Sequence, residues 1–65
     1  MMATPPKRIA LKYGMDVAII LKADQASGVL TYGKIQKILT SSPTHPHGIK
    51  VRLSTGEVGR VQALI

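Results

Sequence analysis

Basic side chains on one face of a predicted strand are the residues of this chain best suited to bind a ligand. Lys50 and Arg52 alternate with apolar residues along segment 49–53, and Arg60 follows in the next apolar segment. Such alternation is typical of a strand with one buried and one solvated face. Arginine binds phosphate through a planar fork of donors, and lysine binds it as a mobile point charge. The pattern therefore predicts a strand whose outer face can contact phosphate groups.

The sequence also predicts how the two apolar segments of 49–61 pair as a hairpin. A two-residue turn would direct Arg60 into the core, because a slip of one residue inverts every side chain. A three-residue loop at 54–56, with Gly56 in the left-handed conformation, keeps the arginine outside. We therefore expect Lys50 to lie opposite Arg60 on the outer face.

In this register Arg52 lies diagonal to Arg60, so that three cations share one face. Like charges directly opposite each other destabilise a sheet by a few tenths of a kcal/mol up to about 1 kcal/mol. One interpretation is that a phosphate normally sits between them. The alternative is that long basic side chains splay apart at little cost. Lys34 and Lys37, on the preceding predicted strand, are candidates to extend the same patch.

His45 and His47 flank Pro46 in a loop rich in Ser, Thr and Pro. A metal site needs three or four ligands, and the chain has no cysteine to complete one, so we predict no metal site. A histidine in a basic loop can instead stack on a base or contact phosphate. The alternative is that both residues are held only by turn chemistry. We include both among the candidate nucleic-acid-binding residues.

Catalysis has no residue constellation to support it. The chain has three acidic residues and no cysteine, and its serines lack an evident base with an orienting acid. There is no glycine-rich phosphate-binding loop followed by lysine. A chain of 65 residues also has little room for a substrate pocket. We therefore expect no enzyme activity and no cofactor.

Charge and size limit the partners of this protein. Nine Lys and Arg face three Asp and Glu, a formal net charge of +6, which favours RNA, DNA or an anionic surface as partner. The alternative is that the charge serves solubility. No segment reaches the roughly 18 apolar residues of a membrane span, and the N-terminus lacks a secretory signal, so we expect a cytoplasmic protein without membrane attachment. A small aliphatic core is compatible with a monomer or a homodimer.

The order of predicted elements indicates one small β domain at 13–65, preceded by a flexible basic tail at 1–12 that contains adjacent prolines. Within 30–39, Ile35 and Ile38 are three residues apart, which breaks strict alternation. A helix would explain this spacing, but a β-bulge near 36–37 fits the neighbouring strand-forming residues better. The predicted elements are a short edge segment at 9–13, strands at 16–22 and 30–39, loops at 23–28 and 40–47, and the C-terminal hairpin.

The first half of the chain resembles the KOW motif of ribosomal proteins and transcription elongation factors. The resemblance is carried by 14–20 (GMDVAII), Gly28 and 33–38 (GKIQKI), although the chain has several residues between Gly28 and the following glycine. It implies a strand, a loop and a second strand that bends at a glycine, within an SH3-like barrel.

A longer resemblance, over 14–61, is to the YwbE family of small uncharacterised bacterial and archaeal proteins. It implies a compact, mostly β domain and brings no catalytic residues. The strings that carry it are 21–33 (LKADQASGVLTYG), 38–40 (ILT), 45–53 (HPHGIKVRL) and 56–61 (GEVGRV).

Together these observations predict an all-β domain, a small SH3-like or KOW-like barrel of four to five strands. The expected function is nucleic-acid binding, with RNA favoured over DNA through the KOW resemblance, which is an analogy at the level of fold. The alternative is a protein-interaction module, or a subunit of a larger assembly, that uses a sheet edge or the His-Pro-His loop. The candidate nucleic-acid-binding residues are Lys34, Lys37, His45, His47, Lys50, Arg52 and Arg60.

Overall fold

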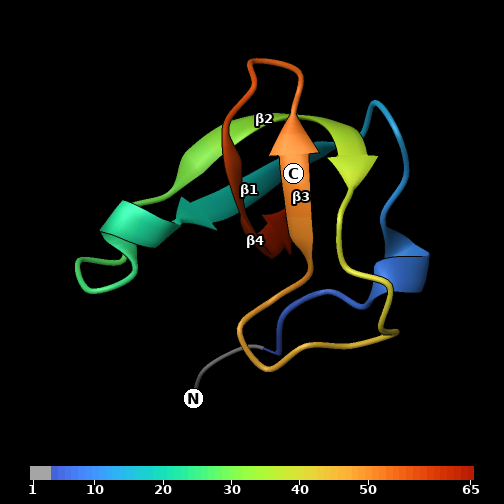
Figure 1. Cartoon of the computed structure of the whole chain (residues 1–65), viewed down its shortest axis with the longest axis horizontal. Helices are drawn as coiled ribbons and strands as arrows, with labels where there is room; N and C mark the ends of the chain where they lie inside the picture. Colours follow the sequence, from blue (N-terminus) through green and yellow to red (C-terminus); the bar gives the residue numbers. More distant parts are fainter. Residues whose placement is uncertain (1–3) are drawn as a thin grey trace.

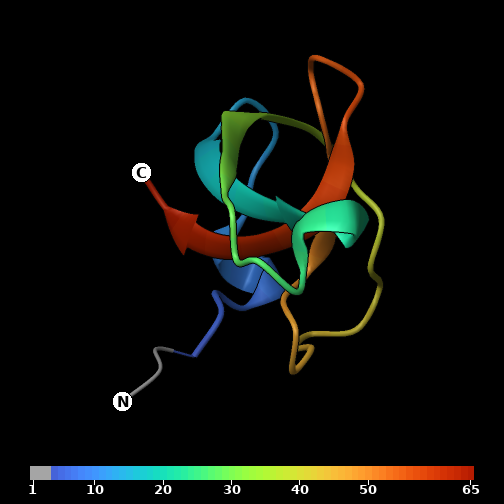
Figure 2. The same ribbon diagram turned by 90° about the vertical axis from the view of Figure 1, so that its left-hand side faces the viewer.

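Four antiparallel strands form a closed barrel in the order β1-β2-β3-β4, with β4 pairing back onto β1. The computed structural model describes residues 4–65. Figures 1 and 2 show the strands wrapped around a common interior, with short 3-10 turns and loops outside. The predicted all-β barrel is thereby confirmed, and its architecture is consistent with a small SH3-like barrel. The elements are η1 (Arg8–Ala10), β1 (Asp16–Leu21), η2 (Lys22–Asp24), β2 (Thr31–Ile38), β3 (Lys50–Leu53) and β4 (Val58–Leu64).

The core of the barrel is aliphatic, as the composition requires. Alternation along β3 places Val51 and Leu53 inside and leaves Lys50 and Arg52 exposed. Burying an aliphatic side chain of this size stabilises the fold by about 1.5–3 kcal/mol. The buried cluster consists of Leu11, Val17, Ile19, Ile35, Ile49, Val51, Leu53 and Val61.

The hairpin formed by β3 and β4 has the predicted register. Lys50 lies opposite Arg60, and Val51 lies opposite Gly59. The loop closes through Gly56, which has φ +95° and whose backbone N–H donates to the Leu53 carbonyl at 2.8 Å. The three-residue loop with a left-handed glycine is therefore confirmed, and it keeps Arg60 on the outer face.

A bulge in β2 is also confirmed. Ile35 pairs with Leu53 and Lys37 pairs with Arg52, so one residue, Gln36, is extra on the β2 side. The extra residue bends the strand, and a bent strand can pair with β1 in its first half and with β3 in its second half. A second bulge, at Gln62 of β4, was not anticipated by the sequence pattern.

The segment before β1 differs from the prediction. The expected edge segment at 9–13 is wrong, because Arg8–Ala10 forms a 3-10 turn and no strand occurs before Asp16 in the described part of the chain. Leu11, which the prediction assigned to the N-terminal tail, is 4% exposed and belongs to the core. Arg8 donates from its backbone N–H to the Pro43 carbonyl at 2.9 Å. Residues 1–3 of the predicted tail lie outside the described residues.

The loop between β2 and β3 runs beside η1 (Figure 1). It is irregular and mostly exposed, as predicted for 40–47, and it ends at Gly48 and Ile49, which are buried. The predicted loop at 23–28 overlaps the 3-10 turn η2, and Gly28 at its end has φ +76°. The Ser27 hydroxyl donates to the Asp24 carbonyl at 3.2 Å. Among residues 4–65, no helix has the length and apolar character to span a membrane.

Candidate nucleic-acid interface

Four cationic side chains lie next to one another on the outer surface of β2, β3 and β4. Two cross-strand pairs bring them together, Lys37 with Arg52 and Lys50 with Arg60. Lys37, Lys50 and Arg52 are exposed, and Arg60 is half-buried. We call these four residues, Lys37, Lys50, Arg52 and Arg60, the basic band.

No carboxylate interrupts the basic band. The remaining strand partners of its members are apolar, since Arg52 lies opposite Val58 and Arg60 lies opposite Ile20. Glu57, in the hairpin loop, accepts a hydrogen bond from the Thr55 hydroxyl at 2.9 Å. The band therefore concentrates positive charge without local compensation.

Lys34 lies apart from the basic band and has its own partner. Its ammonium group contacts both carboxylate oxygens of Asp16, at 3.0 and 3.1 Å. Asp16 is also its cross-strand partner in β1. This exposed ion pair offsets the charge of Lys34, so that this candidate is less suited to bind phosphate than Lys37.

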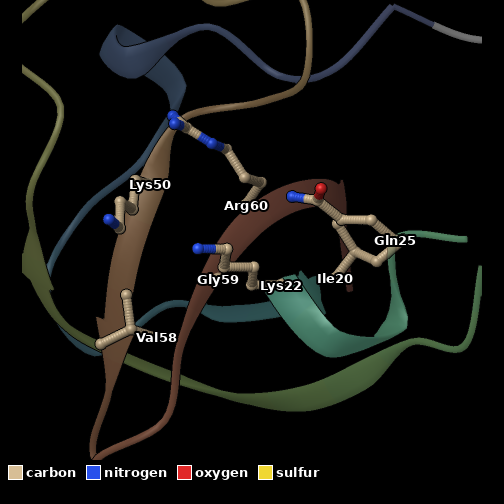
Figure 3. Close-up of a pocket in the computed structure, with 7 residues that line it drawn as sticks. All are labelled: Ile20, Lys22, Gln25, Lys50, Val58, Gly59 and Arg60. Carbon is tan, nitrogen blue, oxygen red and sulfur yellow. The ribbon is translucent and has the colours of Figure 1, made fainter.

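A shallow hollow of about 470 Å³ lies beside the basic band, between η2 and the β3–β4 hairpin. Figure 3 shows Lys22 and Gln25 on the η2 side of this hollow, and Lys50 and Arg60 on the other side. Asp24 lies between Lys22 and Gln25 in the sequence but does not line the hollow. The hollow therefore collects positive charge from separate parts of the chain.

Lys22 was not among the residues expected from the sequence to bind nucleic acid. Lys22 directly follows β1 in the chain. Ile20, a residue of β1 whose side chain points outward, lies opposite Arg60. Because residues two apart share a face of a strand, the pair Ile20 and Lys22 was the signal that could have placed the lysine near the band. The curvature that brings η2 to the hairpin was not visible in the sequence.

The guanidinium group of Arg60 links the basic band to the preceding loop. Its Nη1 donates to the Gly48 carbonyl at 3.2 Å. Arginine has five N–H donors, so the others remain available to a ligand. This bond holds the side chain in one position, which reduces the conformational entropy lost when it binds phosphate.

His45 and His47 are close together at the end of the loop. Their ring centroids are 5.8 Å apart, and the His47 backbone N–H donates to His45 Nδ1 at 3.1 Å. The bond requires an unprotonated Nδ1, so it favours the neutral His45 ring with its proton on Nε2. Loss of hydration lowers the pKa of His45, and the positive charge of Arg60 and then His47 lower it further.

A titration of His45 is expected to show this effect. Its pKa should lie below the ordinary value of about 6.5 and should rise when Arg60→Gln removes the nearby charge. Since the pKa is lower in the folded state, the neutral ring's contribution to stability is complete above about pH 6.5 and is lost as pH falls. Imidazole proton shifts in NMR spectra measure both values, and an unchanged pKa in the variant would exclude the influence of Arg60.

The described residues contain no cluster of possible metal ligands. Within residues 4–65 there is no group of three or more His, Cys, Asp or Glu side chains that could hold a metal ion.

Comparison with known proteins defines the family of this chain. The family model described as "Uncharacterized conserved protein (DUF2196)" matches residues 4–64. The chain belongs to this family. It is 51% identical over 59 residues to "Uncharacterized protein YwbE" of Bacillus subtilis (strain 168), with 91% of each chain covered. This confirms the predicted relationship to YwbE, while the KOW resemblance stays a prediction. No solved structure shows significant similarity to the chain.

Proposed function

We propose that this protein binds nucleic acid through the basic band, and that its ligand is single-stranded RNA in preference to DNA. The observation that carries the proposal is the row of cations on three adjacent strands with no carboxylate among their strand partners. The proposed preference for RNA rests on the KOW resemblance alone. We place this activity in the cytoplasm, without membrane attachment.

The energetics of the band support a polyanionic ligand. Two like-charged pairs face each other across neighbouring strands, and each such pair costs a few tenths of a kcal/mol up to about 1 kcal/mol. A phosphate bound between the members of a pair replaces this repulsion by attraction. The resulting affinity depends on charge and hence on salt.

Sequence preference should be weak, because aromatic side chains are scarce. Tyr13 and Tyr32 are the two aromatic residues of the chain outside its histidines, and neither belongs to the basic band. Base stacking supplies much of the affinity of many single-strand binders. Contacts to phosphate should therefore dominate the free energy of binding.

A titration of the protein into labelled single-stranded RNA at several salt concentrations tests the proposal. For single strands, each phosphate contact contributes about −0.7 to the slope of log K against log salt, so four contacts predict a slope of about −3. Absence of binding at low salt would overturn the proposal. Equal affinity for single-stranded DNA would overturn only the preference for RNA.

The alternative, a protein-interaction module, predicts a different outcome. A specific protein should then be recovered with the tagged chain, and nuclease treatment should leave the complex intact. Recovery that is lost after nuclease treatment would instead support a contact through nucleic acid.

A further inference from the structure

A second hollow, of about 610 Å³, adjoins the cationic one. The two share Ile20 and Gln25 as a common wall. The lining of the second hollow has no Lys, Arg, Asp or Glu. A surface that is cationic on one side and largely apolar on the other thus runs from the β3–β4 hairpin to the His-Pro-His loop.

The lining of this second hollow combines apolar surface with a few polar groups. Leu30, which is 38% exposed, and Pro46 offer apolar surface, and the imidazole of His47 offers a flat ring. Gln25 and Gln62 add amide groups. A flat heteroaromatic ring with polar edges matches this combination, because its faces contact apolar and ring atoms while its edge contacts amides.

Gln62 is held in place by the chain itself. Its Nε2 donates to the His47 carbonyl at 2.9 Å and to the Arg60 carbonyl at 3.3 Å. These bonds use the amide nitrogen and leave Oε1 as an acceptor. Gln62 is the extra residue of the bulge in β4. The bulge therefore supplies a fixed polar group beside the hollow.

We propose that the second hollow receives one unpaired nucleobase of a single strand whose phosphates lie on Lys22, Lys50 and Arg60. This inference rests on the proposed function and adds to it a second contact that depends on the base. Phosphate and base are adjacent in a nucleotide, as the cationic and apolar hollows are adjacent here. A base within a duplex cannot enter, because pairing and stacking hide its faces and edge.

The experiment compares single-stranded RNA with inorganic polyphosphate, a polyanion without bases. The variant His47→Ala with Leu30→Ser removes a ring and an apolar side chain from the hollow without removing a Lys or Arg. Loss of one stacked base should weaken RNA binding by about 10-fold or more at pH 8 and leave the salt slope unchanged. The affinity of this double variant for polyphosphate should equal that of the wild type.

The matched control is Tyr13→Ala. Tyr13 is 82% exposed and does not line either hollow, so its removal deletes an exposed ring elsewhere on the surface. RNA affinity should not change. A loss equal to that of the double variant would place base stacking at Tyr13 and overturn the assignment of the base to this hollow.

A second measurement does not depend on the variants. NMR spectra of the wild-type complex with single-stranded RNA should show cross-peaks from base protons to the His47 ring and the Leu30 methyl groups. If RNA binds but the cross-peaks are absent and the double variant retains full affinity, the base contact is wrong and the phosphate contact stands. If the wild type binds no RNA, both proposals fail.

Discussion

Replacing Lys50 and Arg52 by glutamine should weaken the binding of single-stranded RNA by about 10-fold or more at low salt and reduce the magnitude of the salt slope by about 1.4. Both side chains are exposed and lie in the centre of the basic band. Their removal deletes two of the four phosphate contacts proposed for the basic band. Titrations of labelled RNA at several salt concentrations measure both the affinity and the slope.

The same variant should keep or gain stability. Lys50 faces Arg60 and Arg52 faces Lys37, so the substitutions remove one member of each like-charged pair. The free energy of unfolding in urea should stay constant or rise by up to about 1 kcal/mol for each pair. Arg60 is kept because its guanidinium group donates a hydrogen bond to the Gly48 carbonyl, so that its replacement would remove a hydrogen bond as well as a charge.

Lys7→Gln with Lys12→Gln is the matched control. It removes the same total charge from exposed residues outside the basic band. RNA affinity should fall much less than in the band variant, since these lysines are not part of the proposed contact. An equal fall in both variants would attribute binding to net charge and contradict a specific role of the band.

Gly48→Ala should leave the protein largely unfolded. Gly48 has φ +101°, and a Cβ atom there would collide with the backbone carbonyl oxygen of Val61. Left-handed strain costs about 1–3 kcal/mol, and overpacking costs typically 1–3 kcal/mol more. The core of a domain of this size supplies only roughly 3–5 kcal/mol. The collision is with backbone, so no side-chain rotation relieves it.

Circular dichroism and urea titration measure the loss of folded protein in Gly48→Ala. The variant Gly28→Ala is the control. Gly28 also has a positive φ, +76°, but a Cβ there meets nothing within 4 Å. Its replacement should cost about 1–2 kcal/mol from backbone strain alone and leave a folded protein. If the two variants lose similar amounts of stability, the close approach of the Val61 carbonyl to Gly48 is not the cause of the loss in Gly48→Ala.

The hairpin and the β2 bulge were predictable because local rules decide them. The alternation of apolar and basic residues in 49–53 decides which side chains face the core. A three-residue loop then keeps Arg60 on the outer face, whereas a two-residue turn would direct it inward. In the same way, Ile35 and Ile38 both face inward only if one residue between them is extra. Each inference needed only residues close in sequence.

Contacts between distant segments were the part that the sequence did not reveal. Leu11 enters the core from a segment that contains no strand, and nothing near it in the chain has a periodic pattern. Lys22 reaches the hollow because β1 curves toward β4, which depends on closure of the barrel. Gly59 lies where a Cβ would be 2.5 Å from the Ile20 carbonyl oxygen, so its packing role needed the β1–β4 pairing to be known.

Closure of the barrel gives each of the four strands a partner on both sides. Proteins with open sheets risk strand addition, in which a foreign chain or another copy extends the hydrogen-bond ladder. Within residues 4–65, no strand of this barrel is unpaired along a whole side, but β2 pairs with β1 over 31–34 and with β3 over 35–38, so each of its sides is covered only in part. A macromolecule that docks on the outer face of the described strands contacts their side chains, and replacing those side chains can abolish docking without opening the sheet.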